Sequence, residues 1–354
     1  MLEPQHMHDC CRKTLNDRRV FLFLDEESVS SALQFEILDL RHFSASSLRP
    51  VLDEESRLWS DRLQWDYRTS ADLLLQYLDS RVLPGYVALE NGRISGYVFC
   101  VYEDHKAIIG DVFSLSDAAA DVEDQLLRHL IELLRHSPGI DRVECQLLLH
   151  PHGLHAEIFE QAGFRLFRRL FMELDLEHFE PSPSQPPFPQ GLTLSTWREN
   201  DFHPAGYLIA DAYSGHLDSF INDQYRSVAG SLRFLHNIVR FPGCGLFDPA
   251  ASRVLTRKTD GSLAGVLLCS RVREDIGHVT QVCVARSQRH LGLGRRLIEE
   301  CAENLQTRGF RGLTLTVTEE NANAVELYRR VGFVEKHSFD AMVWDRSWSW
   351  TNEA

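Results

Sequence analysis

The stretch from Val282 to Leu297 reads VCVARSQRHLGLGRRL and joins a predicted strand to a predicted helix. Two glycines, Gly292 and Gly294, stand where the amphipathic helix begins. Glycine lets the backbone approach a ligand closely, and the free N–H groups of a first helical turn attract anions. The stretch therefore predicts a cradle for a phosphate group.

Two common phosphate-binding motifs do not fit this stretch. A dinucleotide-binding fingerprint needs a third glycine where Leu297 stands, and a Walker loop needs Gly-Lys-Ser/Thr where Gly294 is followed by two arginines. By contrast, Arg289-x-x-Gly292-x-Gly294 resembles the pyrophosphate loop of the GNAT superfamily of acyl-CoA-dependent N-acyltransferases.

A second motif strengthens this resemblance. After one predicted helix and one predicted strand, the chain reads Asn321-x-x-Ala324-x-x-Leu327-Tyr328-x-x-x-Gly332-Phe333, which is similar to the second GNAT signature. The close resemblance covers residues 192–345. An internal duplication extends a degraded version of it to the preceding half of the chain.

The duplication appears in two pairs of positions. Gly96 and Gly265 each follow a hairpin turn, and Gly-Phe pairs begin at Gly163 and Gly332; both offsets are 169 residues. Between the halves, residues 180–190 hold five of the 13 prolines, which predicts a stiff linker. We therefore expect an extension at 1–30, a degenerate GNAT-like domain at 31–179, the linker at 180–190 and a catalytic GNAT domain at 191–354.

Hydrophobic periodicity predicts alternating strands and helices in both halves, so each is α/β. The resemblance implies two GNAT-like domains, each with a mixed, largely antiparallel central sheet that is flanked by helices and splayed at the acyl-CoA site. The predicted strands are 86–89, 94–101, 108–115, 143–149, 169–174, 254–259, 263–271, 278–284, 313–317 and 339–344. The predicted helices lie around 126–134, 155–162, 297–305 and 323–331.

The composition is that of an ordinary globular protein. Of 354 residues, 44% are hydrophobic and 25% charged, and the net charge of −14 argues against a nucleic-acid partner. No apolar run is long enough to span a membrane, and the first residues lack a secretory signal, so we expect a cytoplasmic protein.

The first residues do contain possible metal ligands, namely His6, His8, Cys10 and Cys11. A frayed terminus is the favoured interpretation of this segment. The remaining cysteines are scattered without a Cys-x-x-Cys pair, so we predict no metal site.

The resemblance implies acetyl-CoA as the co-substrate and assigns residues to it. A strand would pair its backbone with the pantetheine and stabilise the oxyanion, the loop would hold the pyrophosphate, and two asparagines would contact the cofactor from the other side. Tyr328 is also implied as the acid that protonates the leaving thiolate. The residues so assigned are Val282, Cys283, Val284, Arg289, His290, Leu291, Gly292, Leu293, Gly294, Arg295, Asn321, Asn323 and Tyr328.

Aminolysis of a thioester needs an uncharged amine, so a base or a water chain must take a proton from an amine of pKa about 10.4. His278 falls where some protein-acetylating GNAT members have a catalytic carboxylate. A histidine can act as a base near neutral pH. Asp275 and Glu274 acting through water, and water alone, are the alternatives.

The first two helices of a GNAT domain usually bind the acceptor, which implies residues 201–239 and the connection 241–248 here. Candidates are Tyr213, His216, Asp218, Asn222 and Asp223, although Asp218 could equally cap a helix. The acceptor is expected to be a primary amine of a small molecule or a protein, attacking directly in a ternary complex. The oligomeric state is left open.

The preceding half is predicted to lack a working site. No glycine occurs between Gly110 and Gly139, four acidic residues stand before its helix, and Phe159 replaces the counterpart of Tyr328. The sequence thus predicts one active site in an N-acetyltransferase. A non-catalytic acyl-CoA sensor and a two-site acyltransferase are the alternatives.

Overall fold

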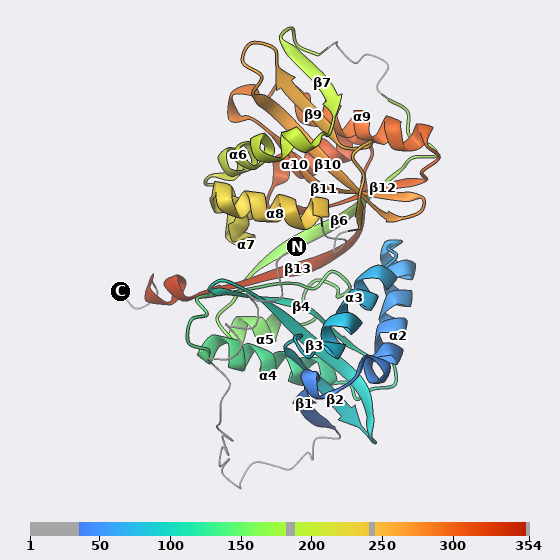
Figure 1. Ribbon diagram of the computed structural model, residues 1–354, viewed down its shortest axis with the longest axis vertical. Helices are drawn as coiled ribbons and strands as arrows, with labels where there is room; N and C mark the ends of the chain where they lie inside the picture. The colour runs from blue at the N-terminus through green and yellow to red at the C-terminus, as the bar shows by residue number, and fades with distance from the viewer. Residues whose placement is uncertain (1–34, 182–187, 241–244, 352–354) are drawn as a thin grey trace. The chain divides into compact units, whose positions relative to one another are not determined.

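A computed structural model describes residues 35–181, 188–240 and 245–351. The strands in these ranges form one sheet in the order β1-β2-β3-β4-β5-β13-β6-β12-β11-β10-β9-β7, with β8 paired to β10 (Figure 1). Among the described pairs, β4 with β5 and β11 with β12 are parallel and the others antiparallel. The predicted α/β fold with a mixed, largely antiparallel sheet is confirmed.

The first half, residues 35–181, and the second half, residues 188–351, repeat one order of elements. The first half contains β1 (Glu36–Asp39), α2 (Ala45–Leu63), α3 (Arg68–Asp79), β2 (Gly85–Glu90), β3 (Arg93–Glu103), β4 (Lys106–Ser114), α4 (Val122–His136), β5 (Arg142–Gln146), α5 (Ala156–Gln161) and β6 (Arg165–Asp175). The second half contains β7 (Leu192–Thr196), α6 (Phe202–Tyr213), α7 (Asp218–Ile221), the 3-10 helix η3 (Asp223–Arg226), α8 (Val228–Arg240), β8 (Leu246–Phe247), β9 (Arg253–Arg257), β10 (Leu263–Arg273), β11 (Ile276–Val284), α9 (Leu293–Thr307), β12 (Gly312–Thr318), α10 (Ala322–Val331) and β13 (Val334–Asp345).

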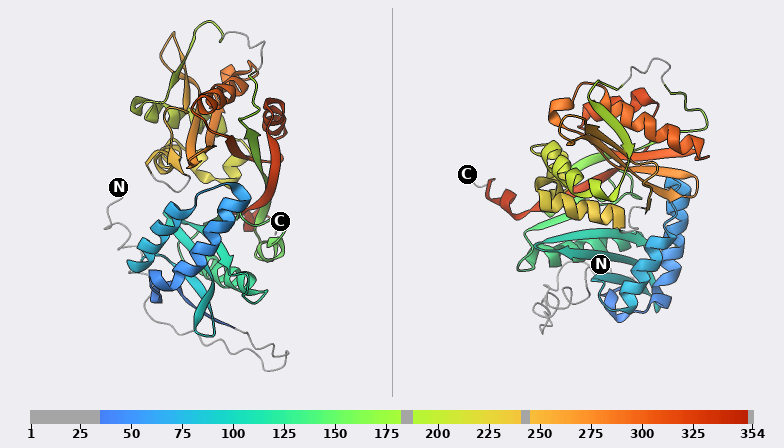
Figure 2. Two further views of the ribbon diagram at one scale, coloured as in Figure 1. Left: turned by 90° about the vertical axis from the view of Figure 1, so that its right-hand side faces the viewer. Right: turned by 45° about the horizontal axis from the view of Figure 1, so that its top comes forward.

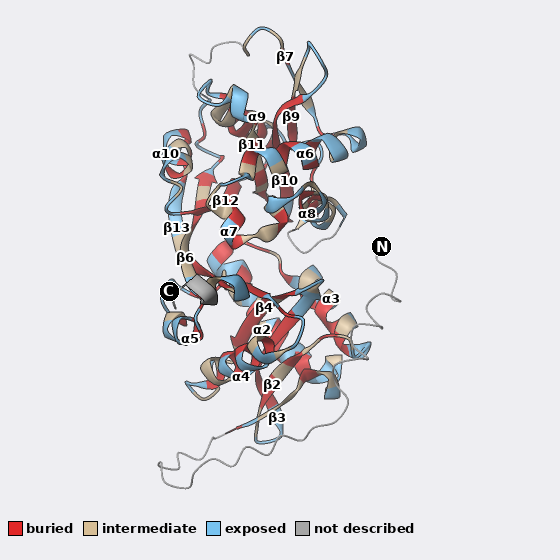
Figure 3. Ribbon diagram, turned by 90° about the vertical axis from the view of Figure 1, so that its left-hand side faces the viewer, coloured by how far each residue is buried: buried red, intermediate tan, exposed pale blue. Residues whose placement is uncertain are grey.

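The helix that follows the cradle forms as its periodicity predicts. Leu297, Ile298, Cys301, Ala302 and Leu305 are completely buried on one face of α9, because residues three and four apart share a side of a helix. They pack with α10 and the inner faces of β10, β11 and β12 in one core cluster. In Figure 3 the strands are mostly buried, whereas the helices expose their outer faces.

The last strands of the two halves pair across the division between them. β6, which belongs to the first half by sequence, pairs with β12 from Gly312 to Thr318. β13, the last strand of the second half, pairs with β6 and also with β5, where Ala341 lies opposite Gln146. Figure 2 shows β6 and β13 as long neighbouring ribbons. The two expected sheets are therefore joined into one.

Several sequence predictions concern residues outside the described ranges. They are the extension at 1–30 with its possible metal ligands, most of the proline-rich linker, and residues 241–244 of the acceptor connection. Among the described helices, none has the length and apolar character needed to cross a bilayer.

Candidate active site

The sheet opens between β11 and β12 in front of the cradle. Their parallel pairing runs from Ile276 with Gly312 to Val279 with Leu315 and then stops. Beyond that point β11 stays paired to β10 as far as Val284, and β12 stays paired to β6. On one edge of β11, the main-chain groups beyond Val279 therefore face the gap and pair with no described strand. This opening is the splay that the resemblance predicts for an acyl-CoA site.

The cradle itself leaves room for a ligand at its glycines. Gly292 has a φ of 73° and forms the N-cap of α9, a conformation that favours glycine. A Cβ atom added at Gly292 or Gly294 would meet nothing within 4 Å. Leu293 anchors the turn in the core, whereas Leu291 is 54% exposed. The first turn of α9 is thus accessible to an anion.

The basic residues of the loop have partners within the chain. Arg289 donates to the carbonyl oxygen of Ala212 at 2.8 Å, and Arg286 donates to that of Asp211 at 2.9 Å. Both bonds tie the loop to the end of α6. Arg295 donates to Glu299 at 2.7 Å. These three arginines are therefore engaged within the chain. The main-chain groups at the two glycines and at the first turn of α9 are more available to a phosphate.

Tyr328 lies inside α10, which begins at the N-cap Asn321 and ends at Gly332. Its side chain is only 7% exposed, and its ring packs against Phe333 with centroids 5.8 Å apart. Burial raises the pKa of Tyr328, and the negative charge of Asp218 raises it further against the opposing charge of Arg169. The hydroxyl stays protonated at neutral pH, as an acid must. Asn323 is exposed on the same helix.

Of the five acceptor candidates, Tyr213, His216 and Asp218 come together beside this site, whereas Asp223 pairs with Lys106. Tyr213 lies against His216, with ring centroids 5.2 Å apart, and donates its hydroxyl to Gln281 on β11 at 2.8 Å. Asp218 accepts a hydrogen bond from Thr318, the last residue of β12, at 2.6 Å. Asn222 instead caps η3, because its side chain accepts from the N–H of Gln224 at 3.0 Å.

Three further polar residues near the gap belong to neither sequence motif. They are Gln281 on β11, Thr318 on β12 and Arg169 on β6. Arg169 donates to Thr316 at 3.2 Å, and its Nε is buried without a hydrogen-bond partner. Polar residues recur along β6 and β12, so no sequence signal singles out Arg169 or Thr318.

His278 lies on β11 where the strand still pairs with β12. Its Nδ1 is 2.9 Å from the hydroxyl of Thr314, and its ring lies against Trp65 and Phe171, with centroids 5.0 and 6.3 Å away. Burial, together with the charge of Arg169, lowers the pKa of His278 to about 3. The ring is therefore neutral at pH 7 but weakly basic, and its role as the base stays a prediction.

The alternative base Asp275 is engaged in ion pairs. Its carboxylate is 2.6 Å from both Arg273 and Arg311, and the bond from Arg273 is the main reason that its pKa is lowered. Asp275 precedes β11, at the end of the strand away from the cradle. It faces other charges rather than the gap.

Side chains of the first half contact residues 218–223 of the second, the segment that carries Asp218. Lys106, whose side chain is 5% exposed, lies 2.5 Å from Asp223 and 3.3 Å from Glu144. Arg142 donates to the carbonyl oxygen of Phe220 at 2.6 Å and to Glu144 at 2.6 Å. Because buried charges need partners, these contacts hold the segment around Asp218 in one position.

Comparison with known proteins agrees with this geometry. Residues 217–333 match the model of the Acetyltransferase (GNAT) family, a range that includes β11, α9, β12 and α10. The second half therefore contains a GNAT domain, as the two motifs predict.

Two curated relatives are mycothiol acetyltransferases. That of Thermobifida fusca is 27% identical over 234 residues, which cover 63% of this chain and 59% of the relative. That of Clavibacter michiganensis is 33% identical over 147 residues, which cover 42% and 44%. The chain thus spans less than two thirds of the length of these relatives.

Solved structures share the fold over most of the chain. A GCN5-related N-acetyltransferase from Sphaerobacter thermophilus has a TM-score of 0.61 at 17% identity, covering 88% of this chain and 96% of that one. A tandem GNAT protein from the clavulanic acid biosynthesis pathway has a TM-score of 0.56 at 16% identity, covering 88% and 98%. These likenesses support the assignment of both halves to GNAT-like folds.

Proposed function

We propose that the chain is an N-acetyltransferase whose second half transfers the acetyl group of acetyl-CoA to a primary amine by direct attack. Two neighbouring features support this proposal. The pairing of β11 with β12 ends at Val279, and the loop that follows β11 forms a glycine cradle with open space at Gly292 and Gly294. A pantetheine chain can add to the unpaired edge of β11 while its pyrophosphate meets the N-terminus of α9.

The residues around the gap suit the three charged species of the reaction, which are the oxyanion, the leaving thiolate and the protonated amine. A main-chain N–H of Val282, Cys283 or Val284 would stabilise the oxyanion that forms on the thioester carbonyl. Tyr328 would protonate the leaving thiolate. The negative charge of Asp218, which raises the pKa of Tyr328, would also attract the protonated amine. Because His278 is only weakly basic, the amine would pass its proton to water before it attacks.

An acceptor screen tests the proposal. The full chain is incubated with acetyl-CoA and candidate amines, the free CoA thiol is recorded, and the product is identified by mass. The acceptor of the mycothiol acetyltransferases is the first compound to test. Release of CoA with an acetylated amine supports the enzyme; tight acetyl-CoA binding without turnover for any amine would favour the sensor.

We expect His278→Ala to lower kcat by less than about tenfold, well below the 10²–10⁴-fold typical of a lost general base. A base must be deprotonated to act, so a group with a pKa of about 3 would place the acid limb of the pH–rate profile near pH 3. A limb nearer neutrality should therefore persist in the variant. Its disappearance would instead assign the base to His278.

We also expect one acetyl-CoA to bind per chain. The counterpart of the cradle in the first half carries Glu123 in the first turn of α4, where its carboxylate accepts from the N–H of Ser114 at 2.9 Å. No glycine stands there, so side chains occupy the positions at which the cradle of the second half leaves its backbone open. Phe159, the counterpart of Tyr328, is completely buried and has no proton to give. Calorimetry that finds two sites of similar affinity would contradict the expectation.

We further propose that the first half acts as a support for the acceptor site through Lys106 and Arg142. Both side chains are buried among carboxylates and main-chain carbonyls of the segment that carries Asp218. This role requires no second active site. The cytoplasmic location expected from the sequence remains part of the proposal.

A further inference from the structure

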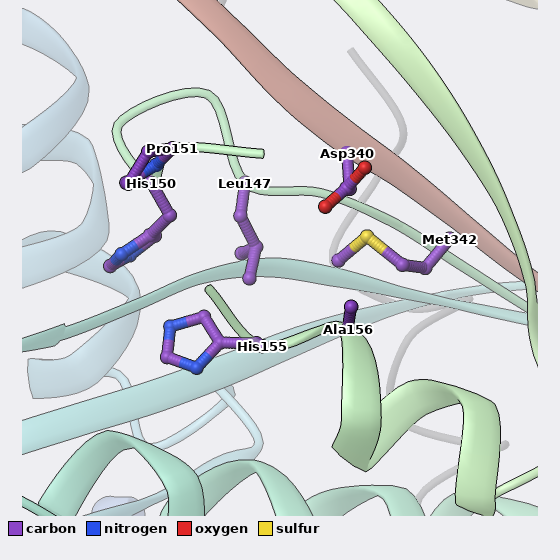
Figure 4. Close-up of a pocket in the computed structure, with 7 residues that line it drawn as sticks. All are labelled: Leu147, His150, Pro151, His155, Ala156, Asp340 and Met342. Atoms are coloured by element: carbon purple, nitrogen blue, oxygen red, sulfur yellow. The ribbon is translucent and has the colours of Figure 1, made fainter. Parts of the chain in front are cut away.

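The first half contains three metal-binding side chains that the proposed reaction does not use. Glu123 lies in the first turn of α4, His150 follows β5, and His155 is the N-cap of α5. One ligand atom of each lies within 4.8 Å of the others. We call these residues the Glu-His-His cluster. Figure 4 shows the rings of His150 and His155 beside each other, where both line a small pocket.

Hydrogen bonds determine which ring nitrogens carry protons when both histidines are neutral. Nε2 of His150 is 2.9 Å from the carbonyl oxygen of Val112, and Nδ1 of His155 is 2.9 Å from Oδ1 of Asp124. A carbonyl and a carboxylate can only accept, so these two nitrogens are the donors. The lone pairs therefore lie on Nδ1 of His150 and Nε2 of His155.

Both lone pairs are close to one carboxylate oxygen. Oε2 of Glu123 is 3.3 Å from Nε2 of His155 and 3.7 Å from Nδ1 of His150. The side chain of His155 is 5% exposed, yet its Nε2 makes no hydrogen bond. Oε1 of Glu123 is already bound by the N–H and the hydroxyl of Ser114. These converging acceptors, two on buried rings and one on a half-buried carboxylate, repel one another unless a metal ion or a proton lies between them.

We propose that the Glu-His-His cluster binds a divalent transition metal, with Zn²⁺ as the best fit. The ligands would be Oε2 of Glu123, Nδ1 of His150 and Nε2 of His155, with water in the fourth position. Zn²⁺ holds such atoms at about 2.0–2.2 Å, which sets neighbouring ligands of a tetrahedron roughly 3.3–3.6 Å apart. The separations of 3.3 and 3.7 Å are close to these values.

The surrounding contacts are those of a metal site. Histidines that bind metals commonly donate their second N–H to a carbonyl or a carboxylate, which fixes ring orientation. Val112 and Asp124 are such partners here.

The cluster occupies the part of the first half that corresponds to the cradle. By the duplication, α4 is the counterpart of α9 and α5 that of α10. Glu123 stands in the first turn of α4 as Gly294 does in that of α9, and His155 is an N-cap as Asn321 is. A bound metal would join the two helices that in the second half flank the cofactor groove.

The test uses the full chain, freed of metal with a chelator and dialysed. Calorimetry with Zn²⁺ and the visible absorption of added Co²⁺ measure the stoichiometry and the geometry. We expect one site per chain with a tetrahedral Co²⁺ spectrum. His155→Ala and His150→Ala should abolish this site. Asp124→Asn, which alters only the partner of a ligand, should weaken it by about 10–100-fold.

Two controls separate this site from other metal ligands. His152→Ala removes a neighbouring histidine whose Nδ1 is bound to Asp340 at 2.6 Å, and it should leave the affinity unchanged. A chain with His6→Ala, His8→Ala, Cys10→Ser and Cys11→Ser should also keep the site. If His155→Ala does not fold, the Zn²⁺ affinities of Asp124→Asn and Glu123→Gln test the site instead. Both variants should bind Zn²⁺ more weakly than the unaltered chain.

Three results would overturn the proposal. The first is that the unaltered chain binds neither Zn²⁺ nor Co²⁺. The second is that folded variants of the cluster bind Zn²⁺ with full affinity. The third is that the chain with the four substitutions at residues 6–11 no longer binds Zn²⁺. Absence of binding would mean that a proton on His155, whose pKa is raised because its two carboxylate neighbours outweigh burial, takes the place of the metal.

Discussion

Replacing Tyr328 by phenylalanine is expected to lower turnover by roughly 10²–10⁴-fold, the range of a lost general acid, while acetyl-CoA still binds. The reason is chemical rather than structural. The buried ring would keep its packing against Phe333, but the leaving thiolate would lose the proton donor that we propose for it. Steady-state kinetics with the acceptor found in the screen gives kcat, and calorimetry gives the affinity for acetyl-CoA.

Tyr225→Phe is the matched control for this experiment. Tyr225 is a half-buried tyrosine whose pKa is raised by burial and by the charge of Asp218. Its ring stacks on that of Tyr213 with centroids 4.3 Å apart. It does not lie on the helix that the second GNAT motif forms. We expect kcat of Tyr225→Phe to stay within a few-fold of the unaltered chain. Equal losses in both variants would refute a specific role for Tyr328.

Replacing Gly294 by valine is expected to lower the affinity for acetyl-CoA by roughly 10²-fold, because the added side chain would separate the pyrophosphate from the first turn of α9. One or two hydrogen bonds to a charged group contribute about 1.5–3 kcal/mol each, and about 2.7 kcal/mol corresponds to 10²-fold. The fold is expected to survive, since a Cβ at Gly294 would meet no protein atom within 4 Å. Calorimetry on the folded variant measures the change.

Gly294→Ala gives this experiment an internal control. Alanine inside a helix is more stable than glycine by roughly 0.5–1 kcal/mol, so this variant should unfold at a higher temperature than the unaltered chain. Its methyl group should nevertheless weaken acetyl-CoA binding, though less than valine does. If both folded variants bind acetyl-CoA with unchanged affinity, the proposal that the pyrophosphate binds at the cradle is refuted.

Most local structure could be predicted from the sequence because its causes are local. The apolar face of α9 follows from residues three and four apart, and Gly332 ends α10 with a φ of 113° that favours glycine. The two signature motifs lie next to these features. The cradle and Tyr328 were therefore identified together with the elements that position them.

Contacts between distant segments could not be predicted in this way. His278 looks like an accessible base on a strand, but Trp65, more than 200 residues earlier, covers it and lowers its basicity. Likewise, nothing near Lys106 in the sequence indicates that it lies 2.5 Å from Asp223. Such pairings depend on how the two halves fold against each other.

The sequence by itself determined the class of fold, the duplication, the cradle at Gly292 and Gly294, and the loss of that cradle in the first half. These depend on spacing and on glycine, which act within one turn or one strand. Only the tertiary structure decided the joining of two sheets through β6 and β13 and the meeting of Glu123, His150 and His155. The physical reason is that a strand can pair, and a buried polar side chain can find partners, with any segment that the fold brings within reach.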